Sequence, residues 1–389
     1  MSTLAQNLSS QQGVEKVNKK TSTLFGLTVT VGLLLAACAP ATPAAPVSQP
    51  TVPPAAGAKK RVKLVLNGTL GDKSFFDSAQ RGMDMIENEL GYEVRTIELG
   101  YDRNKWEPGL EDAAAADDYD ILVAGTFDMS AYVSRIAPQH PNKKFWMFDA
   151  GPDYEGKEGG CSNKCENVYT VLFRQNEGSY LLGVLVGELL KSGSLPGAEG
   201  RTKVGIVGGL DIPVINDFIV GFKQGFAESG LDPEENVLVQ YVGGDSPFNN
   251  PAKGKEIANA MYDQGAVIVW GVAGNSGNGV FEAAVEKKLY ALGVDSDQYQ
   301  TIADPAQKAT IITSMLKNVD QGLLRAAKLD AEGKLKYGAP ESVGVAADAV
   351  GVADNENYQK FVPKEIQEKV LAAYERVAKG EVVVASAFK

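Results

Sequence analysis

Two carboxylates and one lysine are spaced so that they could hold a polar ligand. Asp295 and Asp297 directly follow an apolar run, Tyr290 to Val294, which predicts a buried parallel strand. A second apolar run, Thr310 to Thr313, predicts another strand, which opens into a helix with Lys317 in its first turn. Because ligands of open α/β sheets bind outside the carboxyl ends of the strands, these three side chains suit a ligand rich in hydroxyl and NH groups. The alternative is that the two acids cap turns and that the lysine is solvated.

The composition narrows the classes of function. The chain has 389 residues, which is room for two or three domains, and a formal net charge of -11. Such an acidic chain is unsuited to nucleic acid, because it repels the phosphates. Its single histidine, His140, stands in the turn-like sequence P-Q-H-P. A Ser-His-Asp triad and a histidine-based metal site are therefore not expected, and no cofactor is predicted.

The first residues have the order of an export signal. Three lysines, Lys16, Lys19 and Lys20, precede a 14-residue apolar run from Leu24 to Ala37, which is short for a membrane span but typical of a signal peptide. The run ends in L-A-A-C, which resembles the lipobox of bacterial lipoproteins. That resemblance implies a signal peptide over residues 1–37 and lipidation of Cys38, whose thiol forms the thioether. The alternative is a cysteine buried in a short membrane anchor.

The residues after this signal also fit an exported protein. Residues 38–60 are predicted to be a flexible tether, because Ala39 to Ala58 is rich in alanine, proline, serine and threonine and cannot build a core. Two further cysteines, Cys161 and Cys165, stand in C-S-N-K-C. In an exported chain this spacing favours a local disulfide, whereas in a cytosolic enzyme it could serve metal or redox chemistry.

From Arg61 onward the sequence alternates between apolar strands and helices. The alternation predicts an α/β fold with parallel sheets covered on both faces, and its restart near Arg201 predicts two such domains. The helix after Phe173 is apolar nearly all round, so we expect it to be buried rather than membrane-spanning. Ser74 is expected to cap the first helix. The predicted strands include residues 61–66, 93–99, 121–124, 144–148, 168–173, 203–207, 237–241 and 266–271, and the predicted helices include 106–116, 129–137, 252–264, 280–287 and 363–378.

Six short motifs point to one protein family. They are, in order, G-D-K-S-F-F-D-S-A, F-R-Q-N-E-G-S-Y-L-L-G, V-G-I-V-G-G-L-D-I-P-V, A-G-N-S-G-N-G-V, G-V-D-S-D-Q and T-S-M-L-K-N-V-D. Behind L-A-A-C, they resemble the basic membrane protein family of bacterial lipoproteins over essentially residues 60–389. The best understood members of that family are similar to purine nucleoside receptors, the substrate-binding components of nucleoside ABC importers. The resemblance implies a type I periplasmic-binding-protein fold, in which two doubly wound parallel-sheet lobes are joined by a three-segment hinge. The lobes would be residues 61–173 with 299–328, and residues 174–298 with 329–389.

The resemblance also implies ligand-binding residues in the first lobe. In the family, the loop after the first strand contributes an acid and an aromatic ring, which match Asp72 and Phe75. Phe76 stands where the family has asparagine, and Asp77 beside it could substitute. The acid after the third strand matches Asp128. The alternative is that Asp72 only caps a turn and that the two rings belong to the lobe core.

In the second lobe the match falls on an aromatic ring and a glycine-rich turn. Phe218 matches the aromatic that faces the base, and Gly274 to Gly279, including Gly277, matches the turn. Trp270 ends a strand beside this turn and either lines the cleft or belongs to the core. Phe218 could also be core, and the turn could cradle phosphate, although an acid-rich cleft disfavours anions.

Asp295 and Lys317 match the carboxylate and the lysine that hold the ribose in the family. Lys317 is expected to start a helix after the chain has crossed back to the first lobe, whereas Asp295 ends a strand of the second. Their pairing would therefore bridge the cleft only when the two lobes are closed.

A nucleoside suits this set of residues. Two aromatic rings can sandwich the base, which contributes about 1–1.5 kcal/mol beyond area burial, and carboxylates accept hydrogen bonds from sugar hydroxyls. The predicted function is a monomeric receptor, without enzymatic activity, that is lipid-anchored on the extracytoplasmic face of the cell membrane and serves an ABC transporter permease. Two alternatives stay open: a nucleoside or sugar hydrolase that uses the cleft carboxylates, and a ligand sensor without a transport role.

The lipobox resemblance generates the first test. We expect Cys38→Ala to abolish lipid labelling and to release the protein from the membrane, because the variant has no thiol to acylate. Metabolic lipid labelling and cell fractionation measure both effects. A Cys38→Ala protein that stays as firmly membrane-bound and as lipid-labelled as the parent would contradict the anchor.

Overall fold

The structure is a computed structural model that describes residues 59–157 and 160–388. All of these residues belong to one of the two compact units into which the chain divides. The predicted signal peptide, Cys38 and almost all of the predicted tether lie outside the described residues. Within the described part, no helix has the length and apolar character needed to cross a membrane.

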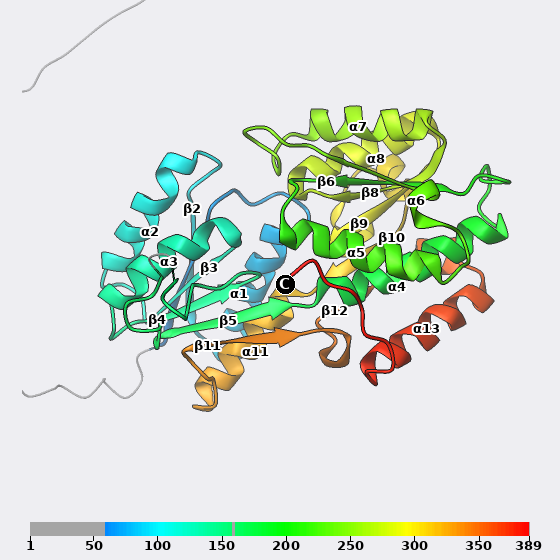
Figure 1. Cartoon of the computed structure of the whole chain (residues 1–389). Coiled ribbons are helices and arrows are strands. Elements are labelled where there is room, and N and C mark those ends of the chain that lie inside the picture. The colour runs from blue at the N-terminus through cyan, green and yellow to red at the C-terminus, as the bar shows by residue number, and fades with distance from the viewer. Residues whose placement is uncertain (1–58, 158–159, 389) are drawn as a thin grey trace, which may run out of the picture. The chain divides into compact units, whose positions relative to one another are not determined.

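The first lobe is built on a six-stranded sheet in which all strands are parallel (Figure 1). Its strand order is β11-β5-β4-β3-β1-β2. The strands are β1 (Arg61–Leu66), β2 (Glu93–Glu98), β3 (Ile121–Gly125), β4 (Lys144–Phe148), β5 (Val168–Phe173) and β11 (Ala339–Val343).

Helices cover both faces of this sheet, as the apolar strands predict. Along β1, Leu64 packs in one apolar cluster with residues of α1 and α11, whereas its neighbour Val65 packs in another with residues of α2 and α3. Neighbouring strand residues point to opposite faces, so both faces are apolar and covered. The helices of this lobe are α1 (Phe75–Leu90), α2 (Trp106–Ala115), α3 (Ser130–Ile136) and α11 (Val319–Ala331).

The second lobe repeats this arrangement on a sheet of order β12-β10-β9-β8-β6-β7. Its strands are parallel except β12, which runs antiparallel to β10. The strands are β6 (Lys203–Gly208), β7 (Val237–Tyr241), β8 (Ala266–Val272), β9 (Tyr290–Asp295), β10 (Ile311–Lys317) and β12 (Val350–Val352). The helices are α4 (Gln175–Ser192), α5 (Pro213–Ala227), α6 (Pro233–Asn236), α7 (Pro251–Asp263), α8 (Asn278–Lys287), α9 (Gln298–Thr301), α10 (Pro305–Thr310), α12 (Glu356–Phe361) and α13 (Lys364–Ala378).

The chain passes between the two sheets three times. It crosses after β5 into α4, after β10 into α11, and after β11 into β12. Three crossings agree with the three-segment hinge that the family resemblance implies.

Three predictions about the segments around these crossings are wrong. Lys317 is the last residue of β10, and α11 begins only at Val319, so Lys317 does not lie in a helix. In addition, β10 pairs with β9 in the second sheet, although residues 299–328 were expected in the first lobe. Conversely, β11 pairs with β5 in the first sheet, although residues 329–389 were expected in the second lobe. An apolar run indicates a strand, but only tertiary pairing selects the sheet to which the strand belongs.

The predicted disulfide is confirmed. Cys161 and Cys165 are bonded, and both residues are buried at the edge of the apolar cluster around α2 and α3. The bond closes a short loop that precedes β5, away from the lining of the pocket described below.

The prediction that α4 is buried is also confirmed. The helix packs along α5 at very short range, because glycines stand where the two backbones meet. A Cβ atom added at Gly225 would overlap the carbonyl oxygen of Tyr180, and one added at Gly183 would overlap the carbonyl oxygen of Phe222. A side chain at either position would therefore push the two helices apart.

This helix contact generates the second prediction. We expect Gly225→Ala to lower the free energy of unfolding by about 2 kcal/mol, because overpacking costs about 1–3 kcal/mol and the higher helix propensity of alanine offsets less than about 1 kcal/mol. Gly351→Ala is the matched control, since a Cβ there meets nothing within 4 Å. Chemical denaturation compares the three proteins. Equal stability of Gly225→Ala and Gly351→Ala would show that the helices do not pack as described.

Candidate functional site

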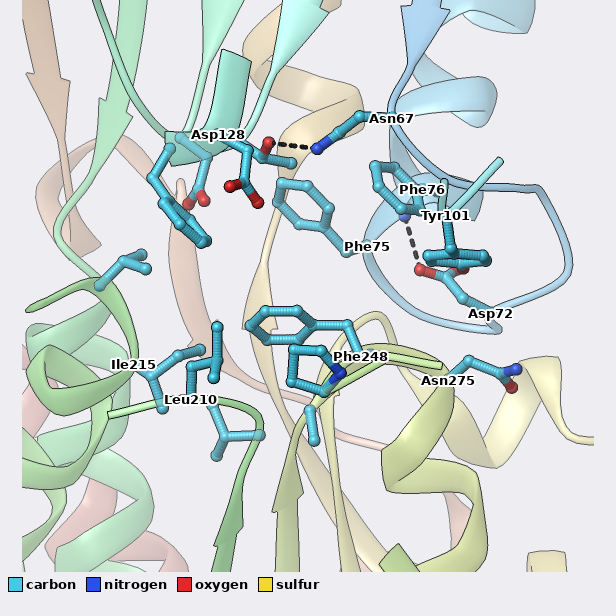
Figure 2. Close-up of a pocket in the computed structure, with 18 of the residues that line it drawn as sticks. Asn67, Asp72, Phe75, Phe76, Tyr101, Asp128, Leu210, Ile215, Phe248 and Asn275 are labelled. Atoms are coloured by element: carbon cyan, nitrogen blue, oxygen red, sulfur yellow. Dashed lines mark hydrogen bonds between the residues drawn. The ribbon is translucent and has the colours of Figure 1, made fainter. Parts of the chain in front are cut away.

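A pocket lies where the carboxyl ends of strands from both sheets come together (Figure 2). This is the position at which open α/β sheets bind ligands. Its empty volume, including the part that opens to solvent, is about 950 Å³. The predicted ligand-binding residues that line it are Asp72, Phe75, Phe76, Asp128, Phe218, Gly274, Asp295 and Lys317.

Lys317 is a buried cation at the base of this pocket. Its Nζ lies 2.6 Å from Oδ1 of Asp149 and 3.6 Å from Oδ1 of Asp295. The same Nζ lies 4.6 Å from the ring centre of Phe75 and 5.1 Å from that of Phe218. Burial lowers the pKa of Lys317, but the two carboxylates outweigh burial and raise it above its usual value. Lys317 is therefore protonated at neutral pH.

Asp295 offers an unused acceptor to a ligand. It ends β9 with a φ of 63°, a left-handed conformation that aspartate tolerates better than most residues. Its Oδ2 accepts a hydrogen bond from Oγ of Ser74 at 2.7 Å, but its buried Oδ1 has no hydrogen-bond partner. The 3.6 Å to Lys317 is too long for a hydrogen bond, so that attraction is Coulombic. Burial raises the pKa of Asp295, and the charge of Lys317 partly opposes this.

The Lys317 cluster differs from the one the sequence predicted. Asp295 and Lys317 end neighbouring strands of the same sheet, so their pairing does not bridge the lobes. The lobes are bridged instead by Asp149, which follows β4 of the first sheet. Sequence analysis missed Asp149, although the strand-end rule that singled out Asp295 applies equally to an acid directly after the predicted strand 144–148.

Asp72 lines the pocket, but its carboxylate is already used as a helix cap. Its Oδ1 accepts from the backbone N–H of Ser74 at 3.0 Å and of Asp77 at 3.1 Å, and its Oδ2 accepts from that of Phe76 at 2.9 Å. Ser74 is the N-cap residue of α1, as expected, but its side chain makes no capping hydrogen bond, because its hydroxyl is directed to Asp295. Burial raises the pKa of Asp72 to about 6, against the lowering effect of the backbone donors.

Aromatic rings enter the pocket from both lobes. Figure 2 shows Phe75 pointing in from the start of α1 and Phe248 pointing toward the same space from the second lobe. Phe76 packs edge-on against Phe75, with ring centres 5.5 Å apart. Sequence analysis missed Phe248, which lies in the loop S-P-F-N-N between β7 and α7. The position of that loop at a carboxyl strand end was the available signal.

Two residues predicted to bind the ligand lie outside the pocket lining. Trp270 is fully buried inside the second lobe, where it packs against Phe222 at 5.5 Å and donates from Nε1 to the carbonyl of Gly293 at 2.9 Å. Gly277 approaches the backbone of Gly271 too closely to face the pocket. Both predictions are therefore wrong. Trp270 and Gly277 face the interior of the second lobe, and periodicity along the chain could not decide which residues at a strand end face the pocket.

An ion pair stands at another part of the pocket wall. Asp128 pairs with Arg103, whose guanidinium lies 4.8 Å from the ring centre of Trp106. Burial raises the pKa of Asp128, and Arg103 opposes that rise. His140 does not line the pocket, and the described residues include no group of three or more acids, cysteines or histidines placed to hold a metal ion.

Comparison with known proteins agrees with this geometry. A family model described as ABC transporter substrate-binding protein PnrA-like (Bmp) matches residues 59–383. The chain belongs to this family. Relatives include the CD4+ T-cell-stimulating antigen of Listeria monocytogenes serovar 1/2a, 28% identical over 331 residues that cover 82% of this chain and 85% of the relative. Another is basic membrane protein A of Borreliella afzelii, 26% identical over 83% of this chain and 91% of the relative.

A solved structure places the fold in the same class. The crystal structure of an ABC transporter solute-binding protein from Aeropyrum pernix K1 matches with a TM-score of 0.69 at 26% identity, covering 84% of this chain and 94% of that chain. The family and the α/β solute-binding fold predicted from the motifs are thus confirmed.

The buried Asp72 generates the third prediction. A carboxyl whose pKa is raised from 3.8 to about 6 on folding stabilises the protein fully below pH 3.8, and this contribution is lost as the pH rises through 6. We expect the stability of the parent relative to Asp72→Asn to fall by about 2.4 kcal/mol between pH 4 and pH 7, since the variant lacks this titration. Chemical denaturation across that range measures it.

Asp84→Asn, on the exposed side of α1, is the matched control. The stability of the parent relative to this variant should vary by less than about 0.5 kcal/mol over the same range. A pH-independent difference between parent and Asp72→Asn would mean that folding does not raise the pKa of Asp72.

Proposed function

We propose that this protein is a membrane-tethered receptor that binds a purine nucleoside in the pocket and serves the permease of an ABC importer. The observation that carries the proposal is the cluster of Lys317, Asp149 and Asp295, with its unused Oδ1, beside aromatic rings. The site combines buried polar groups with apolar walls, and a nucleoside likewise combines a hydroxyl-rich sugar with a flat, largely apolar base.

The polar corner suits the sugar. A hydroxyl can donate to Oδ1 of Asp295 while accepting from the ammonium of Lys317, and hydrogen bonds to charged groups contribute about 1.5–3 kcal/mol each. The apolar walls suit the base, because Phe75 and Phe248 point into the same space from opposite lobes. Stacking between two rings adds about 0.5–1.5 kcal/mol beyond area burial.

The charge of the lining favours an unphosphorylated ligand. Only Arg103 and Lys317 are cationic among the lining residues, and both are paired with carboxylates. Since the lining holds five acids and only two cations, a phosphate would enter a site of net negative charge, and we propose that nucleotides bind much more weakly than nucleosides. The acidic lining residues are Asp72, Asp128, Asp149, Asp245 and Asp295.

The anchor and the partner are part of the same proposal. The motif L-A-A-C supports lipidation of Cys38 on the extracytoplasmic face of the cell membrane, and relatives of the chain carry the names lipoprotein and basic membrane protein. The family description supports an ABC transporter permease as partner. A monomer without catalytic activity remains our prediction.

The fourth prediction is tight binding without turnover. Isothermal titration should detect adenosine, guanosine or inosine, with much weaker signals for cytidine, free ribose and nucleoside monophosphates. Chromatography after long incubation should return the nucleoside intact. Release of free base would assign the protein to the hydrolases, and binding of free sugars alone would overturn the nucleoside.

Two neighbouring acids provide the matched variants for this titration. Asp295→Ala should weaken nucleoside binding roughly thirty- to a thousandfold, because a charged acceptor is lost from a desolvated site. Asp297→Ala should have little effect, since Asp297 lies outside the pocket lining and accepts a hydrogen bond from Asn355 at 2.8 Å. Equal affinity of the two variants would show that Asp295 does not hold the ligand.

A further inference from the structure

Three consecutive backbone carbonyls of the first lobe are held by side chains of the second. The segment is Asp72–Ser74, between β1 and α1, and each of its carbonyl oxygens accepts one hydrogen bond from the second lobe; that of Ser74 also accepts from the backbone N–H of Ser78 at 3.1 Å. The donors of the second lobe come from three separate places. The bonds are Asn278 Nδ2 to Asp72 O at 3.1 Å, Thr301 Oγ1 to Lys73 O at 2.9 Å, and Ser296 Oγ to Ser74 O at 2.8 Å.

The first lobe itself holds this segment in the shape that exposes its carbonyls. Two nearby carboxylates accept hydrogen bonds from its N–H groups. That of Asp72 accepts from Ser74 at 3.0 Å, and that of Asp77, in the first turn of α1, accepts from Lys73 at 3.0 Å and from Gly71 at 2.7 Å. Lys73 adopts a φ of 61°, a conformation that non-glycine residues rarely adopt. With the N–H groups of Lys73 and Ser74 satisfied locally, the backbone of the segment contacts the second lobe through its carbonyls.

The hydroxyl of Ser74 reaches further, to the carboxylate that we propose binds the ligand. Ser74 is fully buried, and its Oγ donates to Oδ2 of Asp295 at 2.7 Å. Oγ also lies 3.2 Å from the carbonyl of Val294, but its single proton favours the nearer, charged acceptor. The bond occupies one oxygen of Asp295 and leaves Oδ1 for a ligand. Ser74 itself does not line the pocket.

We propose that the Asp72–Ser74 segment is a clasp between the lobes and that Ser74 is a positioning residue for Asp295. Separation of the lobes would break the carbonyl bonds and withdraw the Ser74 hydroxyl from Asp295 together. The Asp295 carboxylate is then oriented for the ligand only while the two lobes are held together. The clasp therefore sets the rate of ligand release. The inference rests on the proposed function only in taking Asp295 as a ligand group.

Thr301→Val tests the clasp without altering the pocket, because neither Thr301 nor Lys73 lines it. Losing one hydrogen bond should speed nucleoside dissociation roughly three- to tenfold in stopped-flow displacement and leave association unchanged. In the full-length protein without ligand, hydrogen–deuterium exchange should increase over residues 71–78 and 293–298. Ser296→Ala should behave in the same way.

Thr310→Val is the matched control, since Thr310 also donates its hydroxyl to a carbonyl, that of Gln307 at 2.7 Å, but within its own helix. It should match the parent in dissociation rate and in exchange over both segments. Thr301→Ser keeps the hydroxyl and should restore the parent rate. Parent-like exchange in both Thr301→Val and Ser296→Ala overturns the clasp, and this arm needs no ligand, so it decides even where the parent binds no nucleoside.

The positioning role of Ser74 has its own readout. Ser74→Ala should weaken nucleoside binding roughly tenfold in the parent but should weaken it no further in an Asp295→Ala background, because the two residues act through one bond. Equal losses in both backgrounds would show that Ser74 acts through general stability and would overturn its role in orienting Asp295.

Discussion

The burial of the Lys317 ammonium is the constraint on which the rest of the site depends. A buried cation loses its hydration at a cost of several kcal/mol, and the structure must offset this with acids. Asp149 and Asp295 do so, one from each lobe. Two acids exceed the charge of one lysine, so a strong acceptor remains unused in a region that excludes water. The charge balance that tolerates the buried lysine therefore also prepares a site for hydroxyl donors.

The loop after β1 both caps helix α1 and positions an aromatic ring in the pocket. The Asp72 carboxylate closes the start of α1, and this fixes the backbone from which Phe75 enters the pocket. Phe76, which replaces the asparagine of the family pattern, supports Phe75 edge-on instead of offering a polar group. This side of the pocket is consequently more apolar than the family resemblance implies, and under the proposed function base recognition would depend more on ring stacking.

Lys317 illustrates how a residue can be recognised correctly and placed wrongly. The family resemblance implied that it pairs with Asp295 to hold a ribose, and the structure brings both residues to the pocket. The prediction that it lies in a helix was wrong because β10 continues through Lys317, where the sequence S-M-L-K carries no signal that ends a strand. Trp270 shows the opposite case: it lies at a strand end beside a lining loop, yet its ring points into the core of the second lobe.

The sequence by itself determined the alternation of strands and helices, the burial of α4, the local disulfide and the family, because these depend on short-range periodicity and on motifs. Strand ends and the family resemblance also indicated three of the five acids and three of the seven aromatic rings that line the pocket. Only the tertiary structure decided which sheet receives β10 and β11, that Asp149 completes the Lys317 cluster, and that Ser74 holds Asp295. These contacts join residues that are 168 and 221 positions apart, and no local pattern in the chain specifies which distant strand ends will meet.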